Sequence, residues 1–518
     1  MAHDMVPEMM TTAGDGPARS ELATRPTWQL LAANGDERHR LDETGHNRYR
    51  NRYGPEPDLV GFGSCTSSTV SDEAYGQAQR LHGWLRSLDE RYLNRAIDDL
   101  FQGIRSELKS NLAVSAANAF EVVITPSGTD AEYVPLLIAL ERGSKVTSVV
   151  VGAGEAGSGT TAAAGGLHFD AAAPSGAIVT KGDQVDPAIA GRVEVRHIDI
   201  RDAHSRLRPL GEIDAEVADV VAESRAAGRS VLVHLIAHSK TGIHAPSPAL
   251  LNTLADLDDV DVVIDAAQGR FSRRGLGAAL REGRMAIVTG SKFFGGPPFC
   301  GAVLVPRRPG RPEAIERLPE GFRDYFSAAM LPRSWVSARA SLGDWHNVGL
   351  LLRWWASLQE IRDYYSVPAQ LRFEVLTHFQ QVVPEITRGL GSIELDVVPT
   401  TLAAESADRL LESKTTVFPF RCRDALGREL GADELVAVRH RIRHPDHGRS
   451  FEIGQPVTLG SGGSQSSLLR VALGGRNVIR ACVVGEAGDT FADRLNRLSG
   501  DVRDAFTAID AAAREHRG

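Results

Sequence analysis

The stretch that decides the fold runs from residue 261 to residue 306, DVVIDAAQGRFSRRGLGAALREGRMAIVTGSKFFGGPPFCGAVLVP. It contains three short runs, DVVIDAA, MAIVTG and GAVLVP, in which Val, Ile, Leu and Ala dominate. Continuous apolar runs of this length predict strands that are buried on both faces. A helix-sized stretch separates the first two runs, which predicts parallel strands joined by a helix.

The same rhythm extends upstream as far as Phe120. EVVITPSGTD reads as a strand ending in a turn, and AEYVPLLIALERG reads as a helix closed by Gly143. Further predicted strands are KVTSVVV, VEVRHIDI and SVLVHLIA. We therefore predict an α/β fold with a mostly parallel sheet. Ligands of such sheets bind at the carboxyl ends of the strands, so the loops there are the expected site.

The chain divides into three predicted regions. Residues 1–57 are polar and read as a flexible N-terminal arm, residues 58–345 form the large domain, and residues 346–518 form a linking helix and a smaller α+β domain. A helical pattern covers residues 348–376 with a break near Pro368, since proline interrupts a helix. An amphipathic helix is expected over Ala492–His516.

The bulk composition excludes several classes of protein. The chain has 518 residues, 42% hydrophobic and 24% charged, and a formal net charge of −8, which describes a soluble globular protein without the basic surplus of a nucleic-acid binder. Four cysteines lie far apart and form neither a disulfide framework nor a metal site. No signal peptide and no apolar run of about 18 residues is visible, so we expect a cytoplasmic protein without a membrane segment.

Four polar motifs follow predicted strands in order. They are Ser127-Gly128-Thr129, His238-Ser239-x-Thr241, Asp265-x-x-Gln268 and Thr289-x-x-Lys292. Taken singly, each has an ordinary structural explanation as a helix cap, a turn or a solvated surface residue. Their shared order and their placement at strand ends favour a common site.

The set matches the chemical requirements of pyridoxal 5′-phosphate (PLP). A buried carboxylate such as that of Asp265 keeps the pyridine nitrogen protonated. Lys292 supplies an amine for a Schiff base with the aldehyde, and its burial in a cleft would keep that amine neutral more often.

The remaining polar residues have matching roles. Ser127, Gly128 and Thr129 open a helix and would bind the phosphate through backbone N–H groups and a hydroxyl, and Thr289 adds a second hydroxyl. Gln268 would donate to the phenolate oxygen of the ring. Ser239 and His238 would contact that oxygen or the substrate, although His238 is equally compatible with a satisfied core histidine.

These motifs resemble fold type I PLP-dependent enzymes, in particular the class V aminotransferase and cysteine desulfurase group. The matching segments are PSGTDAE (126–132), HSKTGIHAP (238–246), DAAQ (265–268), TGSKFFGGPPFCGAVLVP (289–306) and SLLRVALGGRN (467–477). The resemblance implies an aspartate aminotransferase-like large domain with a seven-stranded type of sheet, and a homodimer. It assigns the phosphate to Thr129, the pyridine nitrogen to Asp265, the ring oxygen to Gln268, the internal aldimine to Lys292 and the substrate carboxylate to Arg470.

The implied activity is that of a transferase or lyase on an amino acid or a similar small molecule. It would proceed through an external aldimine and a quinonoid, by transamination or by β/γ-elimination and replacement. The sequence departs from the group at three points, one of which is Ser291, just before the lysine, where the desulfurases have a His. The position where many relatives carry a ring against the cofactor falls near Glu155 or Ala156, and no Cys lies between Ala432 and Leu469, where desulfurases place their nucleophile.

Three other functions stay open on the sequence. The glycines of GAGEAG (152–157) could make room for a large phosphate- or nucleotide-bearing substrate that a PLP-bound carbanion attacks. The same loop imitates a dinucleotide fingerprint, which would fit an NAD(P)-dependent oxidoreductase. A PLP-binding regulator without turnover is the third, although no DNA-binding segment supports it.

Overall fold

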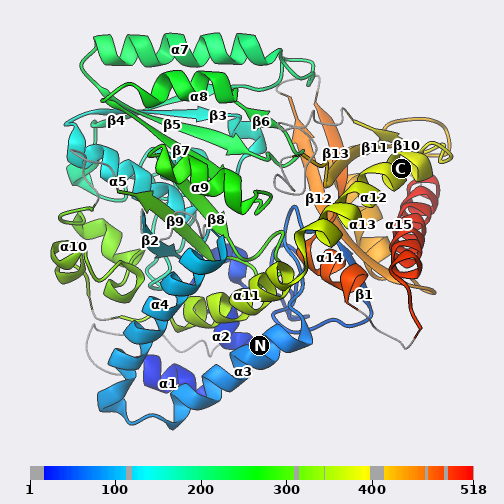
Figure 1. Cartoon of the computed structure of the whole chain (residues 1–518), viewed down its shortest axis with the longest axis horizontal. Coiled ribbons are helices and arrows are strands. Elements are labelled where there is room, and N and C mark those ends of the chain that lie inside the picture. The colour runs from blue at the N-terminus through cyan, green and yellow to red at the C-terminus, as the bar shows by residue number, and fades with distance from the viewer. Residues whose placement is uncertain are drawn as a thin grey trace, which may run out of the picture.

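The computed structural model describes residues 17–112, 120–307, 314–343, 345–396, 413–460, 465–483 and 488–516. Its centre is a large sheet with the strand order β2-β9-β8-β7-β5-β3-β4, and the short β6 pairs with β5 (Figure 1). Its strands are β2 (Phe120–Thr125), β3 (Val146–Val151), β4 (Val193–Ile198), β5 (Ser230–Ala237), β6 (His244–Ala245), β7 (Val260–Ala266), β8 (Met285–Thr289) and β9 (Gly301–Pro306).

Within this sheet β9 and β6 run against the other strands, which are parallel to one another. The apolar runs explain the burial, because all six residues of β3 and all five of β8 are buried. The predicted α/β fold with a mostly parallel sheet is confirmed. The carboxyl ends of β2, β3, β5, β7 and β8 therefore share one edge.

Helices cover both faces of the large sheet. Apolar residues of α7 and α8 pack on one face of β3, β5 and β7, and α5 packs on the other (Figure 1). Ser247 and Ser272 cap α8 and α9 by accepting from backbone N–H groups three residues on. The helices of this region are α5 (Tyr133–Arg142), α6 (Thr160–Ala164), α7 (Leu210–Ala226), α8 (Pro248–Ala255), α9 (Arg273–Arg281) and α10 (Val336–Ala340).

A second sheet lies beside the first, with the order β1-β12-β13-β11-β10. Its strands are β1 (Leu59–Phe62), β10 (Ile393–Leu395), β11 (Val417–Cys422), β12 (Ser450–Leu459) and β13 (Ser466–Ala472). Only the β1–β12 pair among these described strands is parallel. β1 thus belongs to the smaller sheet, although the sequence suggested that the large domain begins at residue 58.

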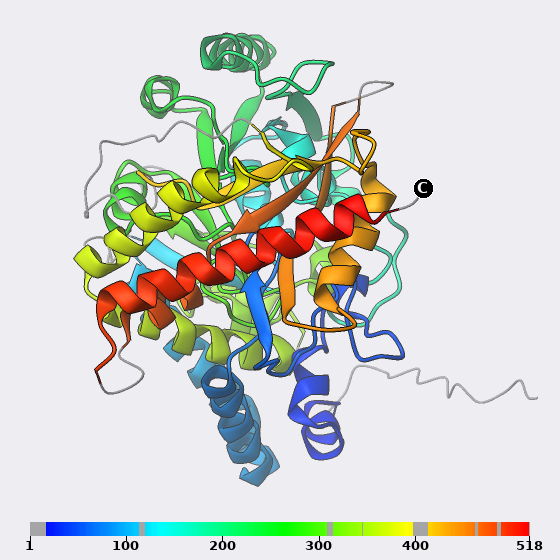
Figure 2. The same ribbon diagram turned by 90° about the vertical axis from the view of Figure 1, so that its right-hand side faces the viewer.

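Helices of the C-terminal region pack around this second sheet. The helix α15 lies against α12 and α13 (Figure 2). The break near Pro368 is present, because α11 ends at Ser366 and α12 begins at Ala369. The helices are α11 (Val348–Ser366), α12 (Ala369–Thr387), α13 (Ala432–Arg443), α14 (Gly475–Cys482) and α15 (Phe491–Arg514).

The N-terminal region is packed where the sequence suggested a flexible arm. Leu30, Leu31, Asn51 and Tyr53 are almost completely buried. Arg353 of α11 holds this segment by donating to the carbonyls of Leu31 and Ala33. The helices that precede β2 are α1 (Pro17–Thr24), α2 (Thr27–Leu31), α3 (Asp72–Ser87) and α4 (Glu90–Leu112).

Two further observations concern the class of protein. In the described part of the chain, no helix combines the length and the apolar character that crossing a membrane requires. All four cysteines are free thiols, as their spacing predicts.

Candidate active site

Three of the motifs meet at the carboxyl edge of the large sheet. The hydroxyl of Thr289, at the end of β8, donates to the carbonyl of Ala267 in the loop after β7 at 2.6 Å. The turn after β2 lies against both, since a Cβ on Gly128 would be 3.1 Å from Thr289 Cγ2 and 3.4 Å from Ala267 Cβ. Gly301 permits this approach, because a Cβ there would overlap the carbonyl of Ser127. The chain thus brings residues 127–129, 265–268 and 289–292 together.

Lys292 is partly buried in the loop that follows β8. Burial lowers the pKa of its ammonium group, the carboxylate of Asp265 opposes this shift, and the cations of Arg470 and Arg270 add to it. The loop itself is fixed, because Gly295 N and Ser68 Oγ donate to the carbonyl of Lys292 at 3.1 and 3.3 Å. A lysine held in this way is neutral more often than a lysine in water, as an attacking amine must be.

Asp265 ends β7, next to the strand that leads to Lys292. Its Oδ1 accepts from the backbone N–H of Ala267 at 3.0 Å. Behind it, Glu132 Oε2 contacts His234 Nδ1 at 2.8 Å. Burial raises the pKa of Glu132, while His234 opposes the shift and the Asp265 carboxylate adds to it. The charge of Asp265 therefore acts both on the ammonium group of Lys292 and on the buried carboxyl group of Glu132.

The turn after β2 contains the residues predicted to bind phosphate. Ser127 Oγ accepts from the backbone N–H groups of Thr129 and Asp130 at 3.1 and 3.2 Å. It also donates to Asp130 Oδ2 at 2.5 Å. Arg38 reaches this turn from the N-terminal segment and donates to Ser127 Oγ at 3.0 Å and to Thr129 Oγ1 at 3.1 Å. Sequence reasoning missed Arg38.

Gln268 lies three residues after Asp265, but its amide already has protein partners. Nε2 donates to the carbonyl of Cys65 at 3.0 Å, and Oε1 accepts from Arg270 Nη1 at 2.9 Å. Arg270 is itself buried and donates to Ser64 Oγ and Thr416 Oγ1. In this arrangement Gln268 joins the loop after β7 to the N-terminal region, and its role toward a ring oxygen stays a prediction.

The loop after β5 forms a separate polar cluster. Glu155, which follows β3, accepts from Ser239 Oγ at 2.6 Å and from the hydroxyl of Thr241. Arg201 Nε donates to the same carboxylate at 2.5 Å, and Arg201 Nη2 donates to Thr241 Oγ1 at 3.2 Å. The hydroxyls of Ser239 and Thr241 are thus directed at Glu155 in this structure.

His238 begins the same loop with a φ of 67°, in the left-handed region. Its Nε2 lies 3.2 Å from His244 Nε2, whereas its buried Nδ1 has no hydrogen-bond partner among the residues that the structure describes. Burial lowers the pKa of His238 well below the ordinary value, and the neighbouring His244 and Arg270 add to this. A strained, neutral imidazole with an unused nitrogen is compatible with the predicted contact to a substrate.

Arg470 comes to the site from the smaller sheet, on β13. It donates to the carbonyls of Gln455 and Lys240 and to Thr66 Oγ1. Its charge acts on Lys292, so the predicted carboxylate-binding arginine and the predicted cofactor lysine are neighbours. Within the described part of the chain Nη1 donates to one carbonyl, so one N–H of the guanidinium is left there for another acceptor.

Lys240 is a second lysine of this site that sequence reasoning missed. Burial lowers its pKa to about 8, and the cations of Arg470 and Lys292 add to the shift while Glu155 opposes it. The sequence offers one signal for Lys240, its position inside the HSKTG motif, because the neighbouring residues of that motif are predicted to belong to the site.

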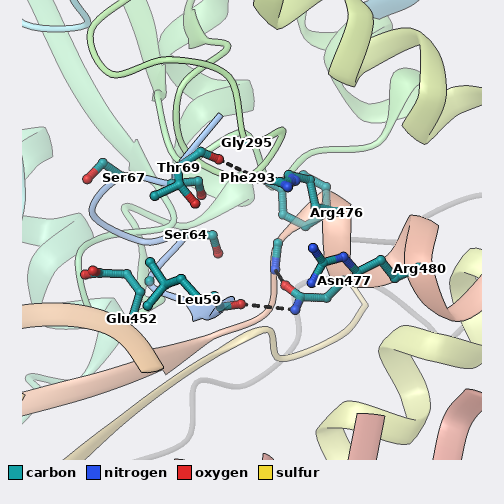
Figure 3. Close-up of a pocket in the computed structure, with 14 residues that line it drawn as sticks. Leu59, Ser64, Ser67, Thr69, Phe293, Gly295, Glu452, Arg476, Asn477 and Arg480 are labelled. Atoms are coloured by element: carbon teal, nitrogen blue, oxygen red, sulfur yellow. Dashed lines mark hydrogen bonds between the residues drawn. The ribbon is translucent and has the colours of Figure 1, made fainter. Parts of the chain in front are cut away.

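A small pocket lies at the junction of the two sheets, beside the loop of Lys292 (Figure 3). Arg476 and Asn477 of α14 close one side of it by donating to the carbonyls of Thr69 and Gly61. Phe293 lines the pocket, whereas the predicted site residues do not. The residues around this pocket therefore belong to three parts of the chain that meet here: α14, the region of β1, and the loop that carries Lys292.

The comparisons with solved structures agree with this arrangement. The chain is similar to a NifS-like protein, with 12% identity, a TM-score of 0.51 and coverage of 87% of this chain and 99% of that one. It is also similar to C-DES with glycine covalently linked to its PLP cofactor, with 14% identity, a TM-score of 0.51 and coverage of 86% and 97%. A third similar structure is the complex of the cystine C–S lyase C-DES with its reaction product cysteine persulfide. It has 14% identity to this chain and a TM-score of 0.50, and the match covers 86% of this chain and 98% of that one.

No protein-family model matches the chain, and no curated protein matches its sequence. The similarities in structure show that the chain has the fold of the fold type I PLP-dependent enzymes, which the sequence predicts. The residues present also fit the cofactor. An amine, a carboxylate and a turn with two hydroxyls meet at one sheet edge, and glycine at position 128 leaves the space above Thr289 and Ala267 free of a side chain.

Proposed function

We propose that the chain is a PLP-dependent enzyme that acts on an amino acid or a similar amine-bearing substrate. One observation carries the proposal. In the fold of PLP enzymes, Asp265 lies near the end of β7 and Lys292 lies in the loop after the neighbouring parallel strand β8, and their charges interact while burial lowers the pKa of the lysine. A lysine with these properties is the group that this cofactor requires.

The roles of the residues follow from their positions. When bound, PLP supplies an aldehyde that condenses with amines and a ring that accepts electrons from the substrate Cα. Lys292 would hold the cofactor and, once displaced by the substrate amine, would move a proton at the substrate Cα. Asp265 would keep the pyridine nitrogen protonated. Arg470 and Lys240 are the cations available to the substrate carboxylate.

The proposed reaction is transamination or an elimination and replacement at Cβ or Cγ. A desulfurase mechanism that uses a Cys on the loop before the late arginine is not supported, since the sequence from Ala432 to Leu469 contains no Cys. The reaction subtype stays a prediction.

The geometry does not favour an NAD(P)-dependent oxidoreductase. After β3 the chain enters a short 3-10 turn, Ala153–Glu155, and the next helix, α6, spans only Thr160–Ala164. A dinucleotide fingerprint instead needs a helix whose N-terminus faces the pyrophosphate. Two of the three glycines of this loop have packing reasons, because a Cβ on Gly152 would meet Ile236 and a Cβ on Gly157 would meet Thr160.

The experiment is to reduce the purified protein with borohydride in the presence of PLP and to map the modified peptide by mass spectrometry. We expect the pyridoxyl group on Lys292, and the visible absorbance of the bound cofactor should disappear in Lys292→Ala. The exposed Lys181, changed to Ala, is the matched control and should leave both signals unchanged. Modification spread over exposed lysines, or an unchanged spectrum of Lys292→Ala, would exclude the proposal.

We also propose a homodimer, as the resemblance implies, which light scattering of the purified protein tests. The cytoplasmic location stays a prediction from the sequence.

A further inference from the structure

The N-terminal segment presents one buried cation to the turn after β2. Arg38 is only 8% exposed, although arginine is seldom buried without a partner. Its partner is Asp36, 4% exposed, which accepts from Nε at 2.8 Å and from Nη2 at 2.6 Å. Two parallel bonds of this kind fix the plane of the guanidinium.

The opposite edge of the same guanidinium faces the turn. Nη2 donates to Ser127 Oγ and Nη1 donates to Thr129 Oγ1. The rings of Phe169 and Phe299 lie 5.3 and 4.8 Å from the guanidinium carbon. Arg38 is therefore held by a carboxylate, by two hydroxyls and by two aromatic rings, which leaves it one orientation.

The segment that carries Arg38 is itself anchored to the core. Arg353 of α11 donates to the carbonyls of Leu31 and Ala33 at 2.9 and 2.7 Å. Asn347 Nδ2 donates to the carbonyl of Asn34 at 2.9 Å, and Tyr53 Oη lies 2.9 Å from His39 Nδ1. These contacts place the cation at the turn as a fixed part of the fold.

Two acids, Asp36 and Asp130, lie close to this turn, so a nearby cation offsets their negative charge. Burial raises the pKa of Asp130 to about 7, and the carboxylate of Asp36 adds to the shift. An anionic ligand at residues 127–129 would otherwise meet two acids without a positive charge in contact with the turn. A guanidinium bonded to both hydroxyls orients their remaining hydrogens and lone pairs and offsets the negative charge.

We propose that Arg38 is a positioning residue of the cofactor site: together with Asp36 it holds Ser127 and Thr129 for the 5′-phosphate of PLP. This inference rests on the proposed function and adds the N-terminal segment to it. The segment around Asp36–His39 completes the phosphate site from a part of the chain remote from the sheet in sequence.

The test compares PLP with pyridoxal, which has the same ring and aldehyde but no phosphate. The dissociation constants of both are measured by absorbance titration, and their ratio reports what the phosphate contributes to binding. In Arg38→Met we expect this preference for PLP to fall by about tenfold, as the loss of charge-assisted hydrogen bonds implies. Arg38→Lys keeps the positive charge but lacks the paired N–H groups of a guanidinium, so its preference for PLP should fall by less.

Arg40→Met is the matched control, because Arg40 is an exposed arginine of the same segment, and its ratio should equal that of the wild type. An unchanged ratio in Arg38→Met and Arg38→Lys would overturn the inference. Tighter binding of PLP by Arg38→Met would also overturn it, since Arg38 would then occupy the place of the phosphate. If Arg38→Met does not fold, the ratio in Arg38→Lys decides.

The two proposals fail in distinguishable ways. A wild-type protein that binds PLP through Lys292 but shows no effect of Arg38 refutes only the role of Arg38. A wild-type protein that binds neither PLP nor pyridoxal refutes both.

Discussion

Two turns at the same edge of the large sheet each combine two hydroxyls with an arginine and an acid, but in one turn the arginine bonds both hydroxyls and in the other the acid does. In the turn after β2, Ser127 and Thr129 accept hydrogen bonds from the guanidinium of Arg38. In the loop after β5, Ser239 and Thr241 donate to the carboxylate of Glu155. Because a hydroxyl can donate or accept, its charged partner decides which kind of ligand the turn suits. In the first turn the guanidinium of Arg38, itself paired with Asp36, contacts both hydroxyls, so this is the turn that we propose for an anion; in the second turn both hydroxyls donate to a carboxylate.

The largest expected effect tests the second turn. Glu155 is 3% exposed and pairs with Arg201, so Glu155→Ala would leave a buried guanidinium without its closest acid. Breaking such a pair costs roughly 3–5 kcal/mol, and we expect about 3 kcal/mol in the free energy of unfolding in urea. The exposed Glu212→Ala on α7 is the control. A loss below about 1 kcal/mol would mean that Glu155 is not what organises this loop.

The next effect concerns the pH dependence of the first turn. Burial raises the pKa of Asp130 from 3.8 to about 7, with Asp36 adding to the shift and Ser127 and Arg38 opposing it. An acid whose pKa is higher in the folded chain takes up protons on folding, so the free energy of unfolding falls as the pH rises from about 4 to about 7.

Asp130→Asn removes this dependence. Its stability relative to the wild type should therefore improve by about 2 kcal/mol between about pH 4.5 and about pH 8, measured by urea unfolding. The exposed Asp219→Asn should show no such change. A pH-independent difference between Asp130→Asn and the wild type would show that Asp130 ionises normally.

The smallest effects come from a matched pair of substitutions. Thr241→Val removes a hydroxyl bonded to Glu155 and should cost about 1–2 kcal/mol of stability without changing the preference for PLP over pyridoxal. Thr129→Val should lower that preference several-fold at a smaller cost in stability. If the two variants gave the same pattern in both measurements, the distinction between the turns would be wrong.

The parts of the fold that could be predicted depend on local pattern. All six residues of β3 are buried and apolar enough to identify a strand of a parallel sheet, and Pro368 separates two helices as expected. That Lys292 and Asp265 lie near enough for their charges to interact also follows from a general rule, because each lies at or just after the carboxyl end of a strand of one sheet. Such features need only short stretches of sequence.

The features that could not be predicted depend on distant contacts. Arg38 lies in a polar stretch that looks like a solvated arm, but contacts with residues far along the chain, among them Arg353 and Asn347, fix this stretch in place. The place of Ser239 at a strand end follows from the sequence, but its partner Glu155 belongs to another loop, and the predicted contact of Ser239 with the cofactor stays a prediction. A sequence shows which hydroxyls reach the edge of the sheet and leaves open which charge they meet.

The parallel pairing of β1 with β12 has a consequence for synthesis. Leu59 and Phe62 leave the ribosome early, but their partners Ser450 and Ile453 emerge near the end of translation. A nascent chain can complete the large sheet while the edge of β1 still lacks its neighbour. The second sheet, and with it the position of Arg470 beside Lys292, can therefore be completed only late in synthesis, and a chain that ends before β13 has the lysine without the arginine.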